Sequence, residues 1–338
     1  GTYTVSLTVS GFGGSDSEIK SDYIQVSTIT VSGQVVYWNK SMPIPDVGCS
    51  ITGDNFYSDT TDPTGAFSLL GISSGSYLLT PSKDDGINGI TAYDAALVLQ
   101  HAAGLEMLSG YQATAADVDE SGIISSMDAS YILQKSVGLI TNIFPGASSM
   151  WSFDPENYVY PDLVANQNNQ DFIGTLLGDV SGSWSDSEGT TSQREASALL
   201  SVRSDTVLTG EMIDISIDLT MEDEDLLAAD LYLTYNPAEL SINGVSLGSL
   251  ANNCPIAFNL ETPGLIRVAI ADTLPINTSG ELLILSIKAI GLPGTDSEID
   301  FTFGDLNEGA IQADLQSGFV YIDGEEPENL IYLPLVLK

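Results

Sequence analysis

The chain has 338 residues, and 46 Asp and Glu against 9 Lys and Arg give a formal net charge of −37. A surface this acidic repels nucleic acid and anionic lipid, so we expect neither as a partner, and it suits a protein that binds divalent cations. The 43% hydrophobic content argues against disorder for most of the chain. No apolar run is long enough to span a bilayer, so we expect no membrane insertion.

Residues 1–28 contain two strand-like runs, TYTVSLTVS and EIKSDYIQVS, joined by a Gly/Ser turn. The pattern Gly-x-Tyr-x-Val-x-Leu-x-Val resembles the closing strands of a PKD domain, a small extracellular β-sandwich. Two strands alone are marginally stable and leave open edges, so they need further strands from elsewhere. Because the sequence enters directly on a strand, we expect it to be a piece of a longer precursor.

Residues 29–82 predict a compact β-sandwich, because strand-like runs alternate there with Pro, Gly and Asp turns. The stretch TDPTGAFSLLGISSGSYLL resembles the carboxypeptidase-regulatory and collagen-adhesin B-type modules that serve as spacers in surface proteins. The resemblance implies a structural role without chemistry.

A helical unit is expected over residues 83–184, where the hydrophobic period changes to about 3.6. The segment DAALVLQHAAGL at 94–105 returns as DASYILQKSVGL at 128–139, so one short amphipathic helix is written twice, each time opening on Asp. A Ser/Glu/Thr-rich linker over 185–195 follows.

The segment DVDESGIISSMD before the second helix fits an oxygen-ligand calcium loop. Such a loop takes its ligands from positions 1, 3, 5, 7, 9 and 12, and has a glycine at the sharp turn of position 6, where Gly122 stands. The alternative is a solvated acidic turn with an Asp cap on the helix. The ligands expected here are Asp117, Asp119, Ser121, the Ile123 carbonyl, Ser125 and Asp128.

The segment KDDGINGITAYD before the first helix departs from this pattern, because Lys83 would take position 1 and cannot ligate a cation. With one deletion after Gly89, the segment aligns again. The candidate ligands of this first loop are then Asp84, Asp85, Asn88 and Asp94.

A calcium loop followed by one helix, written twice, resembles dockerin, a duplicated half-EF-hand module. The resemblance covers residues 83–140, and the continuation to 184 resembles a longer form of the module. It implies that the unit binds calcium and grips a partner protein, the cohesin, through loop positions 10 and 11 and the helix faces. The corresponding residues are Ala92, Tyr93, Gln100, His101, Ser126, Met127, Gln134 and Lys135. His101 has no evident nucleophile beside it, so we interpret it as a contact residue.

Residues 196–323 show strands at regular spacing, which is typical of a β-sandwich or jelly roll. The runs VLTGEMIDISIDL, LLAADLYLTYNPAEL, GLIRVAIAD and GELLILSIKAIG resemble a cohesin, the jelly roll that binds dockerin. The resemblance implies protein binding through one sheet face and no catalysis.

Dockerin-like and cohesin-like modules in one chain allow two outcomes: an intramolecular clasp, or a head-to-tail assembly of copies. Residues 324–338 form an acidic spacer and an apolar strand-like end. That end either completes the sheet of residues 1–28 in a neighbouring subunit by strand addition, or serves as a surface-anchoring signal.

The sequence therefore predicts a mainly β, multidomain chain, with β-sandwiches and a cohesin-like jelly roll flanking a small α-helical calcium module. We expect a non-catalytic scaffold or fibre-forming protein, extracellular or at the cell surface, because no acid pair or nucleophile–base arrangement stands out. The alternative is a carbohydrate-binding, adhesive component of a polysaccharide-degrading complex, with Trp38, Trp151 or Trp184 as sugar platforms. Cys49 and Cys254 are expected as buried or free thiols, and Asn39 and Asn277 stand in glycosylation sequons.

Overall fold

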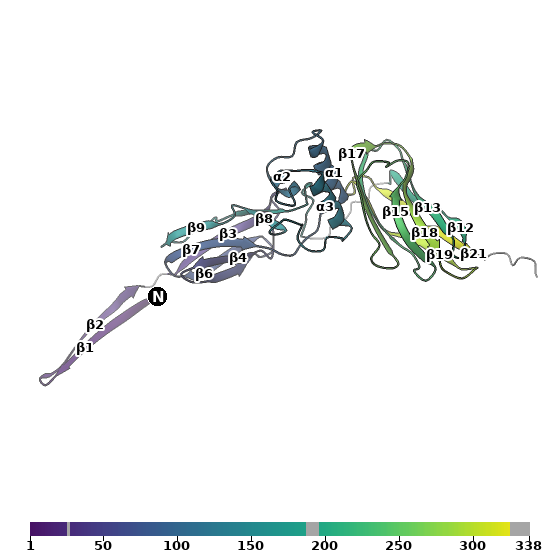
Figure 1. Ribbon diagram of the computed structural model, residues 1–338. Helices are drawn as coiled ribbons and strands as arrows, with labels where there is room; N and C mark the ends of the chain where they lie inside the picture. Colours follow the sequence, from purple (N-terminus) through teal and green to yellow (C-terminus); the bar gives the residue numbers. More distant parts are fainter. Residues whose placement is uncertain (26–27, 187–195, 325–338) are drawn as a thin grey trace, which may run out of the picture. The chain divides into compact units, whose positions relative to one another are not determined.

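The computed structural model describes residues 1–25, 28–186 and 196–324. It divides into two compact units, one made of residues 1–85 and 151–175, the other of residues 86–150 and the chain from 176 onward. The labelled elements in Figure 1 are mostly strands, so the predicted mainly β, multidomain fold is confirmed. Part of the expected linker, residues 187–195, and the expected terminal strand, within 325–338, lie outside the described residues.

The first unit begins with a two-stranded antiparallel hairpin of β1 (Thr2–Gly11) and β2 (Gly14–Gln25). The hairpin was expected from its alternating pattern. Its apolar side chains on β1 are exposed, and they include Tyr3, Leu7 and Val9.

The rest of the first unit is a β-sandwich of two four-stranded sheets. One sheet has the strand order β6 (Ala66–Ile72), β3 (Ile29–Tyr37), β10 (Phe172–Leu176) and β8 (Trp151–Asp154). The other has the order β5 (Tyr57–Thr60), β4 (Gly48–Gly53), β7 (Gly75–Ser82) and β9 (Tyr158–Leu163). Residues 151–175 therefore belong to this sandwich, although we expected them in the helical unit. The parallel pairing of β10 with β3 requires a long crossover, and the helical segment supplies it.

The second unit begins with what we call the helical module, residues 86–150 and 176–186. It contains α1 (Ala92–Ala102), α2 (Tyr111–Ala116) and α3 (Ser126–Ser136). The two predicted helices are α1 and α3, and both are 11 residues long. Each begins with a capping box, Thr91 with Asp94 and Ser125 with Asp128, which satisfies N–H groups that a helix start leaves unpaired.

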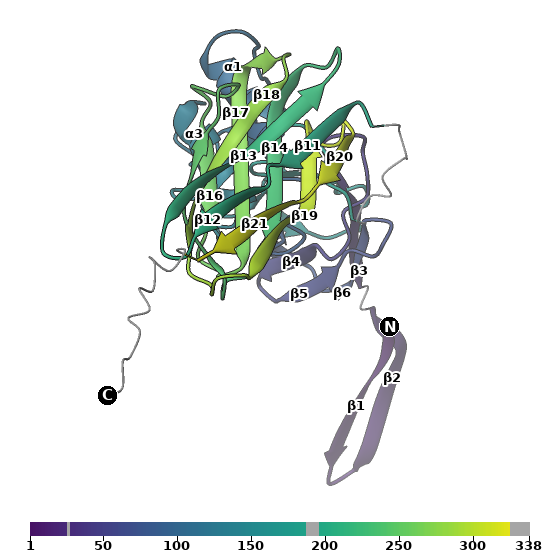
Figure 2. The same ribbon diagram turned by 90° about the vertical axis from the view of Figure 1, so that its right-hand side faces the viewer.

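The C-terminal sandwich, residues 196–324, completes the second unit, and Figure 2 shows it with a sheet face toward the viewer. One sheet has the order β15 (Leu240–Leu247), β18 (Gly280–Ala289), β13 (Met212–Met221), β11 (Ala198–Val202) and β20 (Ala313–Gln316). The other has the order β12 (Asp205–Leu208), β21 (Gly318–Asp323), β19 (Asp296–Leu306), β14 (Leu226–Thr234), β17 (Leu265–Ile276) and β16 (Ile256–Asn259).

The strands β14 and β17 are buried on both faces. Leu231 and Val268 face the sandwich core, whereas Ala228, Asp230 and Ala269 are buried without belonging to that core. A strand that is covered only by its partner sheet alternates buried and exposed residues. Something must therefore cover the outer face, and α1 and α3 pack there.

Cys49 and Cys254 are both buried free thiols. Among the described residues, none of the helices combines the length and the apolar character that crossing a membrane requires.

Candidate metal centre and module contact

The contiguous loop, residues 117–128, gathers three carboxylates. One oxygen each of Asp117, Asp119 and Asp128 lies within 4.8 Å of the others. Asp117 accepts hydrogen bonds from the backbone N–H groups of Ser121 (3.0 Å) and Gly122 (2.8 Å). Gly122 has a φ of +83°, which suits the sharp turn that a glycine allows. These donors fix the carboxylates in place.

Asp128 closes the contiguous loop from the start of α3. It is fully buried, its Oδ1 accepts from Val118 N, and its Oδ2 accepts from Ser125 N and Oγ. Burial raises the pKa of Asp128. Ser121 Oγ lies 3.3 Å from the Ile123 carbonyl oxygen. The donor set of carboxylates, hydroxyl and carbonyl is the all-oxygen set that calcium prefers.

The residues of the expected first loop have different hydrogen-bond partners. Asp84 and Asp85 fall in the first unit, where Asp85 pairs with Lys83 Nζ at 2.7 Å. Asn88 is exposed, and its side-chain amide exchanges hydrogen bonds with the backbone of Ser185. Asp94 is fully buried, and its Oδ1 accepts from Ser181 N at 2.8 Å.

Residues 179–184 and 89–94 together repeat the contiguous loop, and we call them the split loop. Asp179 accepts from Ser183 N and Trp184 N, both at 2.9 Å, as Asp117 accepts from the N–H groups four and five residues further on. Ser183 Oγ lies 3.2 Å from the Gly89 carbonyl oxygen, which matches the hydroxyl–carbonyl pair of the contiguous loop.

The two loops also agree in backbone form and in their closing acid. Gly182 (φ +73°) stands where the contiguous loop has Glu120 (φ +54°), and both adopt the left-handed conformation. The closing acid is Asp94 in one loop and Asp128 in the other, each in a capping box. The split loop therefore draws its first half from one end of the helical module and its second half from the other.

Asp179, Ser181 and Ser183 were missed as candidate ligands. A signal was present, because Asp-Val-x-x-Ser occurs both at 117–121 and at 179–183. It was hidden because the second half of this loop precedes its first half in the chain.

The sequence-predicted partner-binding residues divide into three groups. Gln100 Nε2 donates to Thr273 O of β17 at 3.3 Å, and Gln134 lies beside β16. His101 Nδ1 accepts from Leu108 N, and Lys135 Nζ donates to Asn142 O, so both are held within the helical module. The half-buried Tyr93 lies at the start of α1, and Ser126 and Met127 are exposed.

We call the contact of α1 and α3 with β14, β16 and β17 the module contact. In it, two acids of the sandwich bind the N-terminal end of α1. Ala92 N donates to Asp230 Oδ2 at 2.7 Å, and Thr91 Oγ1 donates to Glu308 Oε1 at 2.8 Å. A helix N-terminus carries unpaired N–H groups and a partial positive charge, so acids stabilise it. Burial raises the pKa of Asp230 to about 7.

At the C-terminal end of α3, the sandwich supplies hydrogen-bond donors instead of acids. Tyr232 Oη donates to Ser136 O at 3.0 Å, and Asn259 Nδ2 donates to Val137 O at 3.1 Å. The carbonyl groups of a helix C-terminus need donors, and the sandwich supplies them. The module contact is therefore complementary at the N-terminus of α1 and at the C-terminus of α3.

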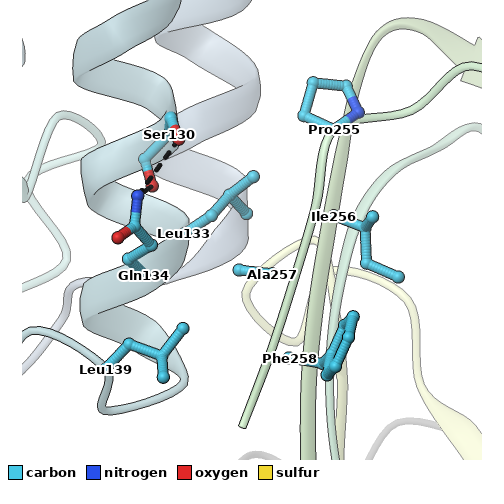
Figure 3. Close-up of a pocket in the computed structure, with 8 residues that line it drawn as sticks. All are labelled: Ser130, Leu133, Gln134, Leu139, Pro255, Ile256, Ala257 and Phe258. Carbon is cyan, nitrogen blue, oxygen red and sulfur yellow. Dashed lines mark hydrogen bonds between the residues drawn. The ribbon is translucent and has the colours of Figure 1, made fainter. Parts of the chain in front are cut away.

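A groove of about 470 Å³ lies between α3 and β16 (Figure 3). Ala257 of β16 points toward Leu133 of α3, whereas Ile256 and Phe258 point away from the helix. The lining residues are Ser130, Leu133, Gln134, Leu139, Pro255, Ile256, Ala257 and Phe258.

No protein-family model matches the chain, and no curated protein matches it. Similar solved structures include the sixth cohesin of Acetivibrio cellulolyticus scaffoldin B in complex with a Cel5 dockerin mutant (18% identity, TM-score 0.35, 38% of this chain and 100% of that chain). A non-cellulosomal cohesin from Archaeoglobus fulgidus is also similar (21% identity, TM-score 0.34, 38% of this chain and 91% of that chain). A cohesin–dockerin complex, Coh-OlpC-Doc435, from Clostridium thermocellum is a third (17% identity, TM-score 0.36, 40% of this chain and 100% of that chain).

Proposed function

We propose that the chain is a non-catalytic, extracellular or cell-surface scaffold protein, stabilised by calcium, whose helical module and C-terminal sandwich recognise each other as dockerin and cohesin do. One observation carries the proposal: α1 and α3 cover the outer face of β14, β16 and β17 and bond to it at both helix ends. Because the contact lies within one chain, the clasp belongs to the proposal, with the head-to-tail assembly as the alternative outcome of the test.

Calcium belongs to the proposal because the helical module gathers buried or half-buried carboxylates around two loops. Asp117, Asp119 and Asp128 would hold one ion, and Asp94 and Asp179 another. Carboxylates at short distance repel one another, and a divalent cation removes the repulsion and completes their coordination. A bound ion also stabilises the fold by its binding free energy.

The test is a calorimetric calcium titration of the metal-stripped full chain, followed by sedimentation with and without chelator. We expect uptake of calcium and a more compact monomer in its presence. The absence of uptake would overturn the calcium part. Calcium-dependent filaments would replace the clasp by the head-to-tail assembly.

The adhesive alternative gains no support from the tryptophans. Trp151 and Trp184 are 4% and 1% exposed, and their indole N–H groups donate to Asp85 O and Gly86 O. A sugar platform needs an exposed ring face. Trp38 is half-buried, so none of the three presents the open ring that this function requires.

A further inference from the structure

Three side chains that carry hydrogen-bond donors form one row across the outer face of the C-terminal sandwich. Arg267 of β17 pairs with Tyr232 of β14 on one side and with Asn259 of β16 on the other. Residues that pair across neighbouring antiparallel strands point to the same face of the sheet. We call these three residues the donor row. It lies on the face against which α1 and α3 pack.

Arg267 is the charged member of the donor row. Its two neighbours donate to the Ser136 and Val137 carbonyl oxygens, whereas Arg267 Nε is buried without a hydrogen-bond partner among the described residues. Over those same residues Arg267 forms no ion pair, although Asp and Glu number 46 in the chain. Its Cζ lies 5.5 Å from the centre of the Tyr232 ring. A half-buried charge without a carboxylate needs another source of negative potential.

The C-terminal end of α3 supplies that potential. The last carbonyl groups of a helix carry a partial negative charge, which a nearby cation stabilises. Gly138 follows α3 with a φ of +79°, and a Cβ atom added to it would lie 3.1 Å from Arg267 Nη1. The guanidinium group therefore lies directly against the turn that ends α3, and a side chain at position 138 would press on it.

The end of α1 has the same turn without the donor row. Both helices are followed by a Gly-Leu pair whose N–H groups donate back to the last helical turn, at 2.8–3.0 Å. Gly104, with a φ of +73°, corresponds to Gly138. An added Cβ at Gly138 would meet Arg267 and Asn259, whereas one at Gly104 would meet no described atom within 4 Å. The two ends are alike in local structure and differ in their contact with the sandwich.

We propose that the donor row is a recognition site for a helix C-terminus, and that Arg267 is its specificity-determining residue. Arg267 supplies the positive charge that a helix end favours, and it covers the Tyr232 ring whose hydroxyl donates to Ser136 O. The partner that fits the row is a helix that ends in a glycine with positive φ. The inference rests on the proposed clasp and names the residue that selects its helix end.

Hydrogen exchange, resolved to single amides by NMR, tests the row in the wild-type full chain in calcium-containing buffer. After correction for neighbouring side chains, the amides of Gly138 and Leu139 should exchange at least about fivefold more slowly than those of Gly104 and Leu105. Equal rates at the two turns would mean that the clasp is open in solution. That result would overturn the proposed clasp together with this inference.

Arg267→Met keeps an apolar stem over Tyr232 but removes the charge. The control is Arg203→Met, which changes an exposed arginine of the same sandwich. In Arg267→Met the difference between the two turns should shrink by at least about threefold, while the β13 amides keep their protection and show that the sandwich stays folded. The control should keep the full difference.

Arg267→Lys separates charge from packing. It should retain most of the difference between the turns, because it keeps a positive charge at the helix end. A wild-type difference in Arg267→Met, or an equal loss in Arg267→Lys and Arg267→Met, would overturn this inference and leave the clasp standing.

Gly138→Ala and Gly104→Ala test the need for glycine. Both variants carry the cost of alanine at positive φ, but Gly138→Ala alone presses on Arg267. We therefore expect the β16 and β17 amides to lose more protection in Gly138→Ala. An equal loss in the two variants would overturn the glycine requirement.

Discussion

Asp94 and Asp128 occupy the same position in their helices, and each accepts the backbone N–H of its own N-cap residue, Thr91 or Ser125, at 2.9 Å. The other oxygen of each carboxylate accepts from a different part of the chain. Asp128 accepts from Val118, ten residues earlier, whereas Asp94 accepts from Ser181, far along the chain. One helical design is thus completed locally in the first case and by a distant segment in the second.

Replacing Asp117 by Asn should abolish most calcium binding at the contiguous loop, because it removes a charged ligand at the first loop position. We expect the affinity of that site to fall by at least about tenfold, measured by titration calorimetry. Glu106→Gln, a change of an exposed acid outside both loops, is the control. Equal affinities in both variants would contradict the ligand assignment.

The module contact should respond to pH through Asp230. Its pKa rises from 3.8 in the unfolded chain to about 7 in the folded chain, chiefly through burial. The protonated form is therefore favoured by folding, so its stabilising effect is complete below about pH 4 and is lost as the pH rises through about 7. Asp305, Glu308, the N–H of Ala92 and the side chain of Ser136 face this carboxyl group.

The unfolding temperature of the metal-stripped chain should accordingly fall between pH 4 and 7, and Asp230→Asn should flatten that part of the profile. Asp305→Asn, which changes the acid on β19 paired with Asp230, should flatten it less. A profile that is identical in Asp230→Asn and wild type would remove Asp230 as the cause.

Tyr232→Phe removes the hydroxyl that donates to Ser136 O at the end of α3. The carbonyl group loses its donor at the contact, and we expect the free energy of unfolding to fall by about 1 kcal/mol. Denaturant unfolding measures this, with Tyr321→Phe, whose ring is 46% exposed, as the control. A loss in the control as large as in Tyr232→Phe would mean that the bond is not the source.

Ala269→Leu should disturb the module contact more than the sandwich itself. Ala269 is fully buried on the outer face of β17, outside the sandwich core, where a larger side chain meets the helices. We expect a cost of about 1–3 kcal/mol from overpacking. Hydrogen exchange should show loss of protection in α1 and α3 with β13 unchanged. Ala102→Leu, an exposed change at the end of α1, is the control.

The sequence was sufficient where the signal is local. The helices α1 and α3 follow from the 3.6-residue period, but their N-caps are Thr91 and Ser125, and the Asp on which each helix was expected to open stands at N3. The gathering of Asp117, Asp119 and Asp128 follows from their spacing within twelve residues, while their role as calcium ligands stays a prediction. The strands of the C-terminal sandwich follow from alternation, since one face of each strand must enter a core.

The sequence was insufficient where distant segments combine. Strand β10 pairs with β3 across the whole helical segment, and no local pattern reports such a pairing. The run AADLYLT predicts a strand, but its alternating pattern does not predict that Asp230 accepts a hydrogen bond from the start of α1. Asp179 pairs with a loop half that occurs earlier in the chain, so a search in sequence order passes over it.

Because the split loop comes from two distant segments, residues 89–94 and 179–184, it limits how this protein can be divided into fragments. A fragment that runs from Ala92 to Leu139 would carry both long helices and the contiguous loop, yet the split loop would be incomplete, because Asp179, Ser181 and Ser183 would be left behind. Expression boundaries drawn around the two similar helices would thus divide the split loop, and only a span from Gly89 to Trp184 keeps both of its halves.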